Sequence, residues 1–279
     1  MKFDQNLAIL HAYLCADGYV ITNPPTQKHK YYHIGLRNTN KVILEDFQKN
    51  FKKVFGLTPV ITKDGRCKIQ NKQIFYQLTK NFSYYSDKWR IPRLSKKELK
   101  CWLRAYFDCD AWVEVQKGKS RVIGLESINR RGLQQIKNIL WKHFKINASG
   151  PKKRKNRKIW YIYICGKDDL LKFKENIGFL HPIKSSRLIE AINSYKNYKW
   201  AIPEGKEEII KFINRRGRLR AKTKEVRFFS ILKDNLIRLK NKLKRYGVDA
   251  KIYGPWKNNI GRNYYCLTFN QKELIKLRR

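Results

Sequence analysis

The sequence predicts an α+β fold of three related units: two pseudo-symmetric α-β-β-α-β-β-α halves with saddle-shaped antiparallel sheets, then a third, truncated αββ-type repeat. Three observations predict it. Apolar residues follow helical and strand spacing in turn along the chain, one strand–turn–helix pattern occurs three times, and a Lys-Trp-x-Ile-Pro phrase occurs twice. Repeated units of this order are typical of sheets that carry helices on one face.

The repeated pattern is a short strand, a polar turn and an amphipathic helix. In the first copy the apolar residues Leu44, Phe47 and Phe51 follow helical spacing, and the other two copies have similar spacing. Each copy continues with a basic segment, a strand and a helix start. The patterns occupy residues 33–56, 122–145 and 225–247, and their continuations occupy residues 66–78, 159–173 and 263–277.

Helices are also predicted just before the first two units, at residues 3–18 and 95–111, and each precedes a strand. The Lys-Trp-x-Ile-Pro phrase stands at 88–92 and 199–203, where its proline ends one segment and introduces a helix. We therefore divide the chain into a first half at residues 1–87, a second half at 88–196 and a third repeat at 197–279.

The composition limits the classes of function. Lys and Arg total 63 against 22 Asp and Glu, and a formal net charge of +41 needs a compensating polyanion, of which nucleic acid is the first candidate. With 42% apolar residues the chain can build a core.

No apolar run approaches the ~18 residues of a spanning helix. We expect no membrane partner and a cytoplasmic location, or an organellar one in a eukaryote. The six cysteines form no CxxC pair, which favours reduced thiols over disulfides or a structural metal.

Two nine-residue stretches place an aspartate at the end of an apolar helix pattern: LHAYLCADG (Leu10–Gly18) and LRAYFDCDA (Leu103–Ala111). Both have a leading leucine, a small third residue and an acid at position eight, which is Asp17 in the first and Asp110 in the second. This pattern resembles the motif of the LAGLIDADG homing endonuclease family. The last glycine is alanine in the second motif, and position six is cysteine in the first. The segment at residues 166–188 also resembles the close of the family's second half.

The resemblance implies that the two motif helices pack together at a pseudo-two-fold axis. Ala12 and Ala105, third in each motif, leave room for the two backbones to approach. The resemblance further implies metal ligation, with one scissile phosphate for each half, by Asp17, Asp110 and the main-chain carbonyls of Ala16 and Cys109. Mg²⁺ or Mn²⁺ suits these oxygen ligands and can activate a water for phosphodiester cleavage. The alternative is that each aspartate only begins a turn.

Catalysis in such sites also uses basic groups near the phosphate. Strand alternation predicts that the side chain of Arg37 faces the nucleic acid, so Arg37 is the candidate for this role. The second half has Glu126 at the matching position, so the role there falls to Lys117 or Lys119, for which the alternative is a simple phosphate contact. We expect His11, inside the first motif helix, to be packed structure rather than a general base.

The two-stranded ribbons are predicted to enter the major groove of DNA, where outward side chains reach base edges and lysines contact the backbone. The predicted DNA-binding residues are Tyr19, Thr22, Gln27, Lys28, His33, Arg37, Lys63, Arg66 and Lys68 in the first half, Trp112, Glu114, Gln116, Lys117, Lys119, Lys152, Lys153, Arg154, Lys155 and Arg157 in the second, and Arg215, Arg216, Arg218, Arg220, Lys257 and Arg262 in the third repeat.

The third repeat lacks the motif aspartate that the first two units have. The stretch from Pro203 to Val226 is about eight residues shorter than the matching stretch from Pro92 to Ile123, which indicates the loss of one short strand and a turn. It contains no aspartate, and its predicted helix ends in arginines. We expect a non-catalytic extension that lengthens the DNA footprint. The alternative is a solvated basic linker before a packing domain.

These observations favour a site-specific, metal-dependent endonuclease that cuts double-stranded DNA at a long asymmetric target. We expect a monomer, because one chain supplies both motif helices. The gene is expected to be free-standing or within an intron; an intein is not expected, because the chain begins at Met1 and ends without splice-junction residues. Three alternatives stay open: an RNA-binding intron maturase on the same fold, a DNA-binding regulator that does not cut, and a ribosome-associated basic protein.

Overall fold

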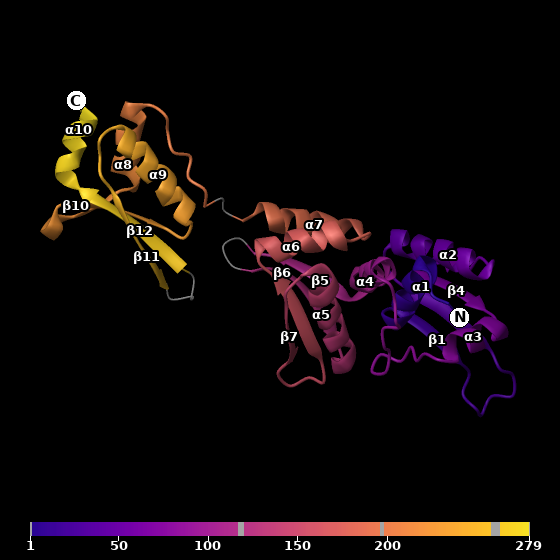
Figure 1. Ribbon diagram of the computed structural model, residues 1–279. Coiled ribbons are helices and arrows are strands. Elements are labelled where there is room, and N and C mark those ends of the chain that lie inside the picture. Colours follow the sequence, from indigo (N-terminus) through magenta and orange to yellow (C-terminus); the bar gives the residue numbers. More distant parts are fainter. Residues whose placement is uncertain (1, 117–119, 196–197, 258–262, 279) are drawn as a thin grey trace. The chain divides into compact units, whose positions relative to one another are not determined.

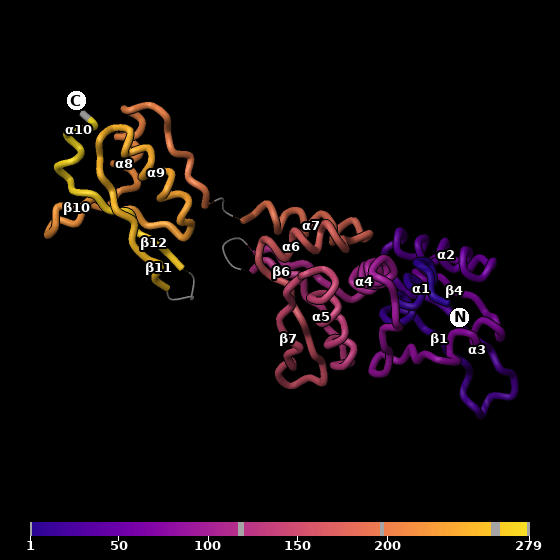
Figure 2. Tube along the Cα trace, viewed as in Figure 1, coloured from indigo at the N-terminus to yellow at the C-terminus, as the bar shows by residue number. Residues whose placement is uncertain are grey.

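The computed structural model describes residues 2–116, 120–195, 198–257 and 263–278 (Figures 1 and 2). The chain forms two compact units, residues 1–195 and residues 196–279. Three of the residues singled out from the sequence, Lys117, Lys119 and Arg262, lie outside the described residues. Within the described ranges, no helix is both long and apolar enough to cross a bilayer.

The first half of unit one contains seven elements in the predicted order. They are α1 (Gln5–Cys15), β1 (Gly18–Thr22), β2 (Tyr32–Arg37), α2 (Lys41–Phe55), β3 (Val60–Thr62), β4 (Arg66–Gln70) and α3 (Lys72–Thr79). The strands form one antiparallel sheet in the order β1-β2-β4-β3. Ile34 and Leu36 of β2 are fully buried in the core, as strand alternation predicts.

The second half repeats this arrangement. Its elements are α4 (Lys96–Asp110), β5 (Ala111–Val115), β6 (Arg121–Ser127), α5 (Arg130–Phe144), β7 (Ala148–Lys153), β8 (Trp160–Cys165) and α6 (Lys167–Asn176), followed by α7 (Pro182–Asn193). Its sheet has the equivalent antiparallel order β5-β6-β8-β7. The predicted α+β fold with two related halves is confirmed.

Local sequence explains where the helices begin. Asn40 caps α2 and Asn129 caps α5, and each side chain accepts a backbone N–H from the first turn of its helix. The two asparagines stand at matching positions of the two halves. α4 begins with a capping box formed by Ser95 and Glu98. This capping box fixes where the helix that carries the second motif acid starts.

Helices α1 and α4 pack side by side in unit one (Figure 1). Ala12 and Ala105 are fully buried, which agrees with the expected close approach of the two helices. His11 lies in the same region: Nε1 of Trp102 donates a hydrogen bond to its Nδ1 at 3.0 Å, and burial lowers the pKa of His11 to about 3. His11 is therefore a packed, neutral residue, as expected. One hydrophobic core runs through both halves.

Unit two has its own core and the same order of elements. They are α8 (Lys206–Arg216), β9 (Arg218–Arg220), the 3₁₀ turn η1 (Ala221–Thr223), β10 (Glu225–Ser230), α9 (Lys233–Arg245), β11 (Lys251–Lys257), β12 (Asn263–Asn270), η2 (Gln271–Glu273) and α10 (Leu274–Arg278). The sheet order is β11-β12-β10-β9. The third repeat is confirmed, but the prediction that it has lost a strand is wrong. The shortening is shared between the helix and the strand: α8 has 11 residues where α4 has 15, and β9 has three residues where β5 has five. All three residues of β9 are exposed.

Candidate active site

Both motif acids lie where a helix gives way to a strand. α1 ends at Cys15, and the chain passes through Ala16 and Asp17 into β1, whereas α4 ends at Asp110 itself and β5 follows directly. Because the two helices pack against each other, their ends come together. The charge of Asp17 is close enough to act on the ionisation of Asp110. Two acids from distant parts of the sequence therefore form one acidic locus.

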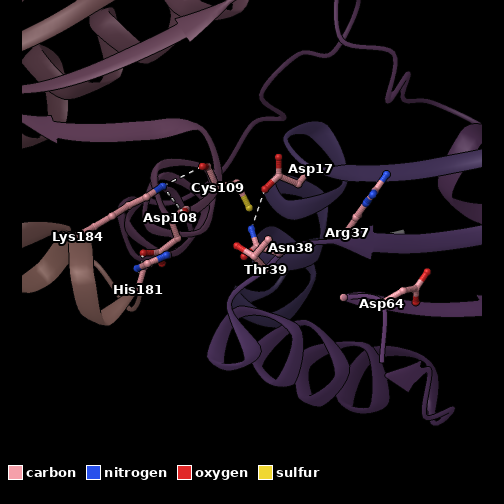
Figure 3. Close-up of a pocket in the computed structure, with 10 residues that line it drawn as sticks. Asp17, Arg37, Asn38, Thr39, Asp64, Asp108, Cys109, His181 and Lys184 are labelled. Atoms are coloured by element: carbon pink, nitrogen blue, oxygen red, sulfur yellow. Dashed lines mark hydrogen bonds between the residues drawn. The ribbon is translucent and has the colours of Figure 1, made fainter. Parts of the chain in front are cut away.

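Two cavities are lined by the paired helix ends. The first cavity has a volume of about 490 Å³ (Figure 3), and the second has a volume of about 350 Å³. The residues that line the first cavity are Asp17, Arg37, Asn38, Thr39, Asp64, Gly65, Asp108, Cys109, His181 and Lys184. Those that line the second are Cys15, Ala16, Ser86, Trp89, Tyr106, Asp110, Glu126, Ser127, Ile128 and Ile159.

Each cavity combines the acid of one motif with the residue that precedes the acid of the other. Asp17 lines the first cavity together with Cys109, and Asp110 lines the second together with Ala16. Both halves therefore contribute to each cavity. The four residues are those that the resemblance implies as metal ligands, and the structure distributes them as two crossed pairs.

Asp17 is held by the turn that follows β2 in its own half. Nδ2 of Asn38 donates to Oδ2 of Asp17 at 2.8 Å, the hydrogen bond drawn in Figure 3, and the backbone N–H of Arg37 donates to the Asp17 carbonyl at 3.2 Å. The Cys109 thiol of the other half lies beside this carboxylate. Burial, followed by the charge of Asp17, raises the pKa of that thiol, so Cys109 is a neutral neighbour.

Asp110 lies in surroundings that disfavour its charge. Burial raises the pKa of this carboxyl to about 7, and the negative charge of Asp17 adds to the effect, while the Tyr106 hydroxyl and the Lys184 ammonium act against it. The Tyr106 hydroxyl lies near Asp110, but no group in the described part of the chain meets hydrogen-bond geometry with it. Two acids that repel each other in a partly buried site are stabilised by a nearby cation.

A lysine of α7 supplies one such cation in the first cavity. Nζ of Lys184 donates to three carbonyls at the end of α4: those of Phe107 at 3.3 Å, Asp108 at 2.6 Å and Cys109 at 2.8 Å. Positive charge is favourable there, because the last carbonyls of a helix have no partner within the helix. In Figure 3 Lys184 reaches the helix end from one side, and Arg37 lies on the other.

Asp108, at position six of the second motif, fixes the start of α7. Its Oδ1 accepts the backbone N–H groups of Leu180 at 3.0 Å and His181 at 2.9 Å. Burial raises the pKa of Asp108 to about 6, although these two N–H groups act in the opposite direction. Asp108 therefore positions the helix that carries Lys184. Position six of the first motif is the buried Cys15, which cannot give equivalent support.

The donor groups of the two cavities suit a hard divalent cation. Carboxylate and carbonyl oxygens are preferred by Mg²⁺ and Mn²⁺, which complete their coordination with water and phosphate oxygens. The described residues contain no group of three or more His, Cys, Asp or Glu side chains that could enclose a metal. One implied ligand has another partner: the Cys109 carbonyl already accepts a hydrogen bond from Lys184. Asp17, Asp110 and Ala16 therefore fit best.

The basic groups of the two cavities differ. Arg37 is exposed and lines the first cavity, as strand alternation predicts. In the second cavity Glu126 stands in its place and forms an ion pair with Arg154, whose guanidinium lies 4.5 Å from the centre of the Tyr161 ring. The cation that the structure places beside the second cavity is thus Arg154.

The outward faces of the two sheets of unit one share one feature. A Cβ atom on Gly35 would lie 2.5 Å from the Tyr19 hydroxyl, and one on Gly124 would lie 2.1 Å from the Trp112 ring. Glycine therefore makes room for an aromatic ring that stands two residues after each motif acid. Both rings lie on the face opposite the core, where DNA contacts were predicted.

One predicted contact is on the wrong face. Thr22 has the same strand parity as the buried Val20, so it lies on the face opposite Tyr19.

Two predicted residues of the outward face, Arg37 and Arg66, are cross-strand partners. Among the other predicted contacts, the exposed residues are Gln27, Lys28, Lys63, Lys68, Gln116, Lys152, Lys153, Arg154, Lys155, Arg157, Arg215, Arg216, Arg218, Arg220 and Lys257, and the half-buried residues are His33 and Glu114.

Several residues of the first cavity were not singled out from the sequence. They are Asn38, Thr39, Asp64, His181 and Lys184. The last two belong to the phrase at residues 166–188 that resembles the close of the family's second half, and this phrase was the available signal. Asp64 lies in the turn between β3 and β4 and pairs with Arg66 at 2.9 Å. No pattern in the sequence marks that turn as part of the site.

Comparison with solved structures gives similar chains at low identity. The crystal structure of I-DmoI in complex with DNA and Ca is 13% identical, covers 66% of this chain and 99% of that chain, and has a TM-score of 0.49. The homing endonuclease I-WcaI bound to its DNA recognition sequence is 18% identical, covers 67% and 88%, and has a TM-score of 0.45. Full-length DUF199/WhiA from Thermatoga maritima is 14% identical, covers 88% and 72%, and has a TM-score of 0.47.

Curated proteins share segments of higher identity. A glutamine–fructose-6-phosphate aminotransferase of Methanocaldococcus jannaschii is 26% identical over 219 residues, which is 72% of this chain and 19% of that protein. A replication factor C small subunit of Thermococcus kodakarensis is 30% identical over 107 residues, which is 38% of this chain and 12% of that protein. The chain thus spans less than a fifth of the length of these relatives.

The family model for the LAGLIDADG-like domain matches the chain twice, at residues 4–86 and 97–178. The two matches cover more than half of the chain, and each contains one motif helix, its acid and the four-stranded sheet that follows. The chain therefore belongs to the LAGLIDADG-like domain family and contains that domain in two copies.

Proposed function

We propose that the protein is a metal-dependent endonuclease that cuts both strands of DNA at a long, asymmetric site. The observation that carries the proposal is the crossed pairing at the helix ends, where each motif acid shares a cavity with the residue that precedes the other acid. Two equivalent positions for hydrolysis are what a double-strand cut requires. Because one chain supplies both positions, the active form is a monomer.

Asp17, Asp110 and the Ala16 carbonyl would hold Mg²⁺ or Mn²⁺, which supplies an activated water and offsets the charge of the phosphate. Asn38 orients the Asp17 carboxylate through its hydrogen bond. Arg37 is placed to bind a phosphate at the first cavity. At the second cavity the pairing of Glu126 with Arg154 keeps a second carboxylate from adding its full charge beside Asp110.

The outward sheet faces and exposed basic loops of unit one are suited to the target duplex. Tyr19 and Trp112 present aromatic surface, and lysines and arginines around them contact phosphates. A hairpin such as β7–β8, with its exposed basic tip at residues 152–158, can follow the DNA backbone. Unit two contributes further exposed arginines, and we propose that it extends the footprint without catalysis.

A DNA-binding protein that does not cut is the second candidate, and one observation favours it. The Lys184 ammonium donates to the Cys109 carbonyl, a position that the resemblance implies for a metal ligand. A lysine bound there offsets part of the acidic charge without a metal. The two candidates differ in whether Mg²⁺ can bind and support hydrolysis while Lys184 stays in place.

The test is cleavage of a plasmid library that carries a randomised site, in Mg²⁺ and in EDTA, by the wild type, Asp17→Asn, Asp110→Asn and the control Glu175→Gln, whose side chain is exposed on α6. Wild type and control should linearise the same sites in Mg²⁺ only. Either Asn variant should lose double-strand cutting by about a hundredfold or more, because the carboxylate serves the metal, while affinity for the selected site in Ca²⁺ stays within about threefold. Binding without any cutting by the wild type would favour the second candidate, and equal cutting by all four would refute the site.

A further inference from the structure

The outward face of the sheet in unit two has a hollow that the proposed cleavage site does not use. It has a volume of about 390 Å³ and is lined by strands β10, β11 and β12. Its lining residues are Glu225, Arg227, Phe229, Tyr253, Trp256, Tyr264, Cys266 and Thr268. Their neighbours in sequence, such as Phe228 and Leu267, are fully buried in the core of the unit. Strand alternation therefore places the hollow on the face opposite that core.

Strand register gives the hollow the form of an aromatic slot. Cys266 of β12 is the cross-strand partner of Phe229 on one side and of Tyr253 on the other. A small residue therefore lies between two aromatic ones, which are 45% and 47% exposed. Trp256 is 44% exposed, and its ring lies 5.6 Å from that of Tyr264. Four aromatic side chains thus surround a floor made by a small residue.

One end of the slot is polar. Thr268, on the same face of β12 as Cys266, pairs in register with Arg227. Nη2 of Arg227 donates to Oε2 of Glu225 at 2.7 Å, and both side chains are about a third exposed or less. The slot therefore joins aromatic faces to a hydroxyl, a carboxylate and a guanidinium. A flat ring with hydrogen-bonding groups on its edge matches this combination.

The equivalent faces of unit one place an aromatic ring at the position that matches Arg227, at the polar end of the slot. There Tyr19 covers Gly35 and Trp112 covers Gly124, so an aromatic ring of the first strand fills the space over the second. In unit two the cross-strand partner of Arg227 on β9 is Arg218, which is exposed. The aromatic residues of unit two stand instead on the other strands. The Tyr264 ring lies 6.4 Å from that of Phe229, and Phe229 and Tyr253 each leave nearly half of their surface exposed to a ligand.

We propose that this slot binds an unpaired base of single-stranded nucleic acid by stacking between Phe229 and Tyr253. Residues 196–279 contain 24 Lys and Arg against 7 Asp and Glu, so the surroundings of the slot attract a phosphate backbone. A base within a duplex is already stacked on both sides and cannot enter. The slot thus gives the protein a second mode of nucleic-acid binding, which does not depend on cleavage.

The test measures the affinity of the full chain for a 20-nucleotide oligo(dT) and for a random duplex, by fluorescence anisotropy at one salt concentration. The variants are Phe229→Ala and Tyr253→Ala, and the control is Tyr198→Ala, which removes a tyrosine of the same unit that is 49% exposed. Each slot variant should lose about tenfold or more in affinity for oligo(dT), the contribution of one stacked base. Duplex affinity should change less than about twofold, and the control should bind both probes like the wild type.

Equal losses for duplex and oligo(dT), or no loss for either, would overturn the proposal. Oligo(dT) and oligo(U) of equal length distinguish DNA from RNA as the source of the base. An oligonucleotide with 5-iodouracil should crosslink on irradiation to a peptide that contains Phe229, Tyr253 or Tyr264, whereas crosslinks confined to unit one would contradict the slot. The result is independent of the cleavage site, because Asp17→Asn should bind oligo(dT) like the wild type.

Discussion

Replacing Asp110 with asparagine should stabilise the metal-free protein at alkaline pH. Burial and the charge of Asp17 raise the pKa of Asp110 in the folded protein from 3.8 to about 7. The folded state therefore holds this proton more tightly than the unfolded state. Stability is highest below the unfolded pKa and falls as the pH rises, until the loss levels off above the folded pKa. Asparagine has nearly the same shape and no charge, so it removes this loss.

The size of the effect follows from the shift. A difference of about three pKa units corresponds to about 4 kcal/mol, which is an upper limit because the carboxylate is only partly buried and solvent in the cavity screens it. Asp110→Asn and wild type should be equally stable near pH 4. Above that pH the variant should become more stable by up to about 1.4 kcal/mol per pH unit, and the difference should be constant above pH ~8.

The assay is urea unfolding of unit one in EDTA between pH 4 and 8.5, with Glu175→Gln as the control for loss of an exposed carboxylate. Millimolar Mg²⁺ at pH 8 should then stabilise the wild type more than Asp110→Asn, because a ligand that binds only the folded state raises its stability. A variant no more stable than the wild type at pH 8, or a stability difference that does not depend on pH, would refute the reasoning about this carboxyl.

Three further predictions follow from the structure. Lys184→Met removes a cation that donates to three carbonyls of α4, so it should raise the pKa of Asp110 further and destabilise unit one by about 1–3 kcal/mol. Carboxyl-carbon NMR titration measures the pKa, and urea unfolding measures the stability. An unchanged pKa of Asp110 would contradict the effect of Lys184 on this carboxyl. Duplex affinity should fall with salt at a log–log slope of about −0.9 per phosphate neutralised, and a slope equal to two contacts or fewer would exclude charge as the main source of affinity. Deletion of residues 196–279 should lower affinity and shorten the DNase I footprint at one end while the cut positions stay the same; an unchanged footprint with a folded truncation would contradict the extension.

The parts of the fold and site that the sequence predicts are those encoded locally. Asp17 and Asp110 stand at the ends of helix patterns that each fit within one short stretch, and the structure ends both helices there. Ile34 and its neighbours follow strand alternation, and the structure buries them as expected. Each motif places its acid and the residue before that acid at one helix end. Once the two helices are known to pack together, the crossed pairing of these residues in the two cavities also follows.

The residues that were missed depend on contacts between distant segments. Lys184 and His181 reach the first cavity only because Asp108 binds the backbone at the start of α7, more than seventy residues away in sequence. The prediction of a lost strand failed because Arg218–Arg220 is only three residues long and none of them is buried, so the sequence pattern is too short to mark the strand that pairs with β10. Thr22 lies on the face of the buried Val20 although it is itself exposed, because β1 ends at this residue, so its polarity does not reveal its face.

The two halves share a fold, but their cavities differ electrostatically. The first contains Asp17 with two cations, Arg37 and Lys184, and its two other acids are already engaged, Asp64 by Arg66 and Asp108 by the backbone at the start of α7. The second contains Asp110 with another acid, Glu126, whose partner Arg154 comes from a hairpin tip. A cavity that already holds lysine and arginine attracts a phosphate before a metal binds. A cavity with a carboxyl that titrates near neutral pH must lose a proton first. On the proposed endonuclease function, we infer that the two strands of the target are cut with different pH dependence, so that below pH ~7 a nick in one strand precedes the double-strand break.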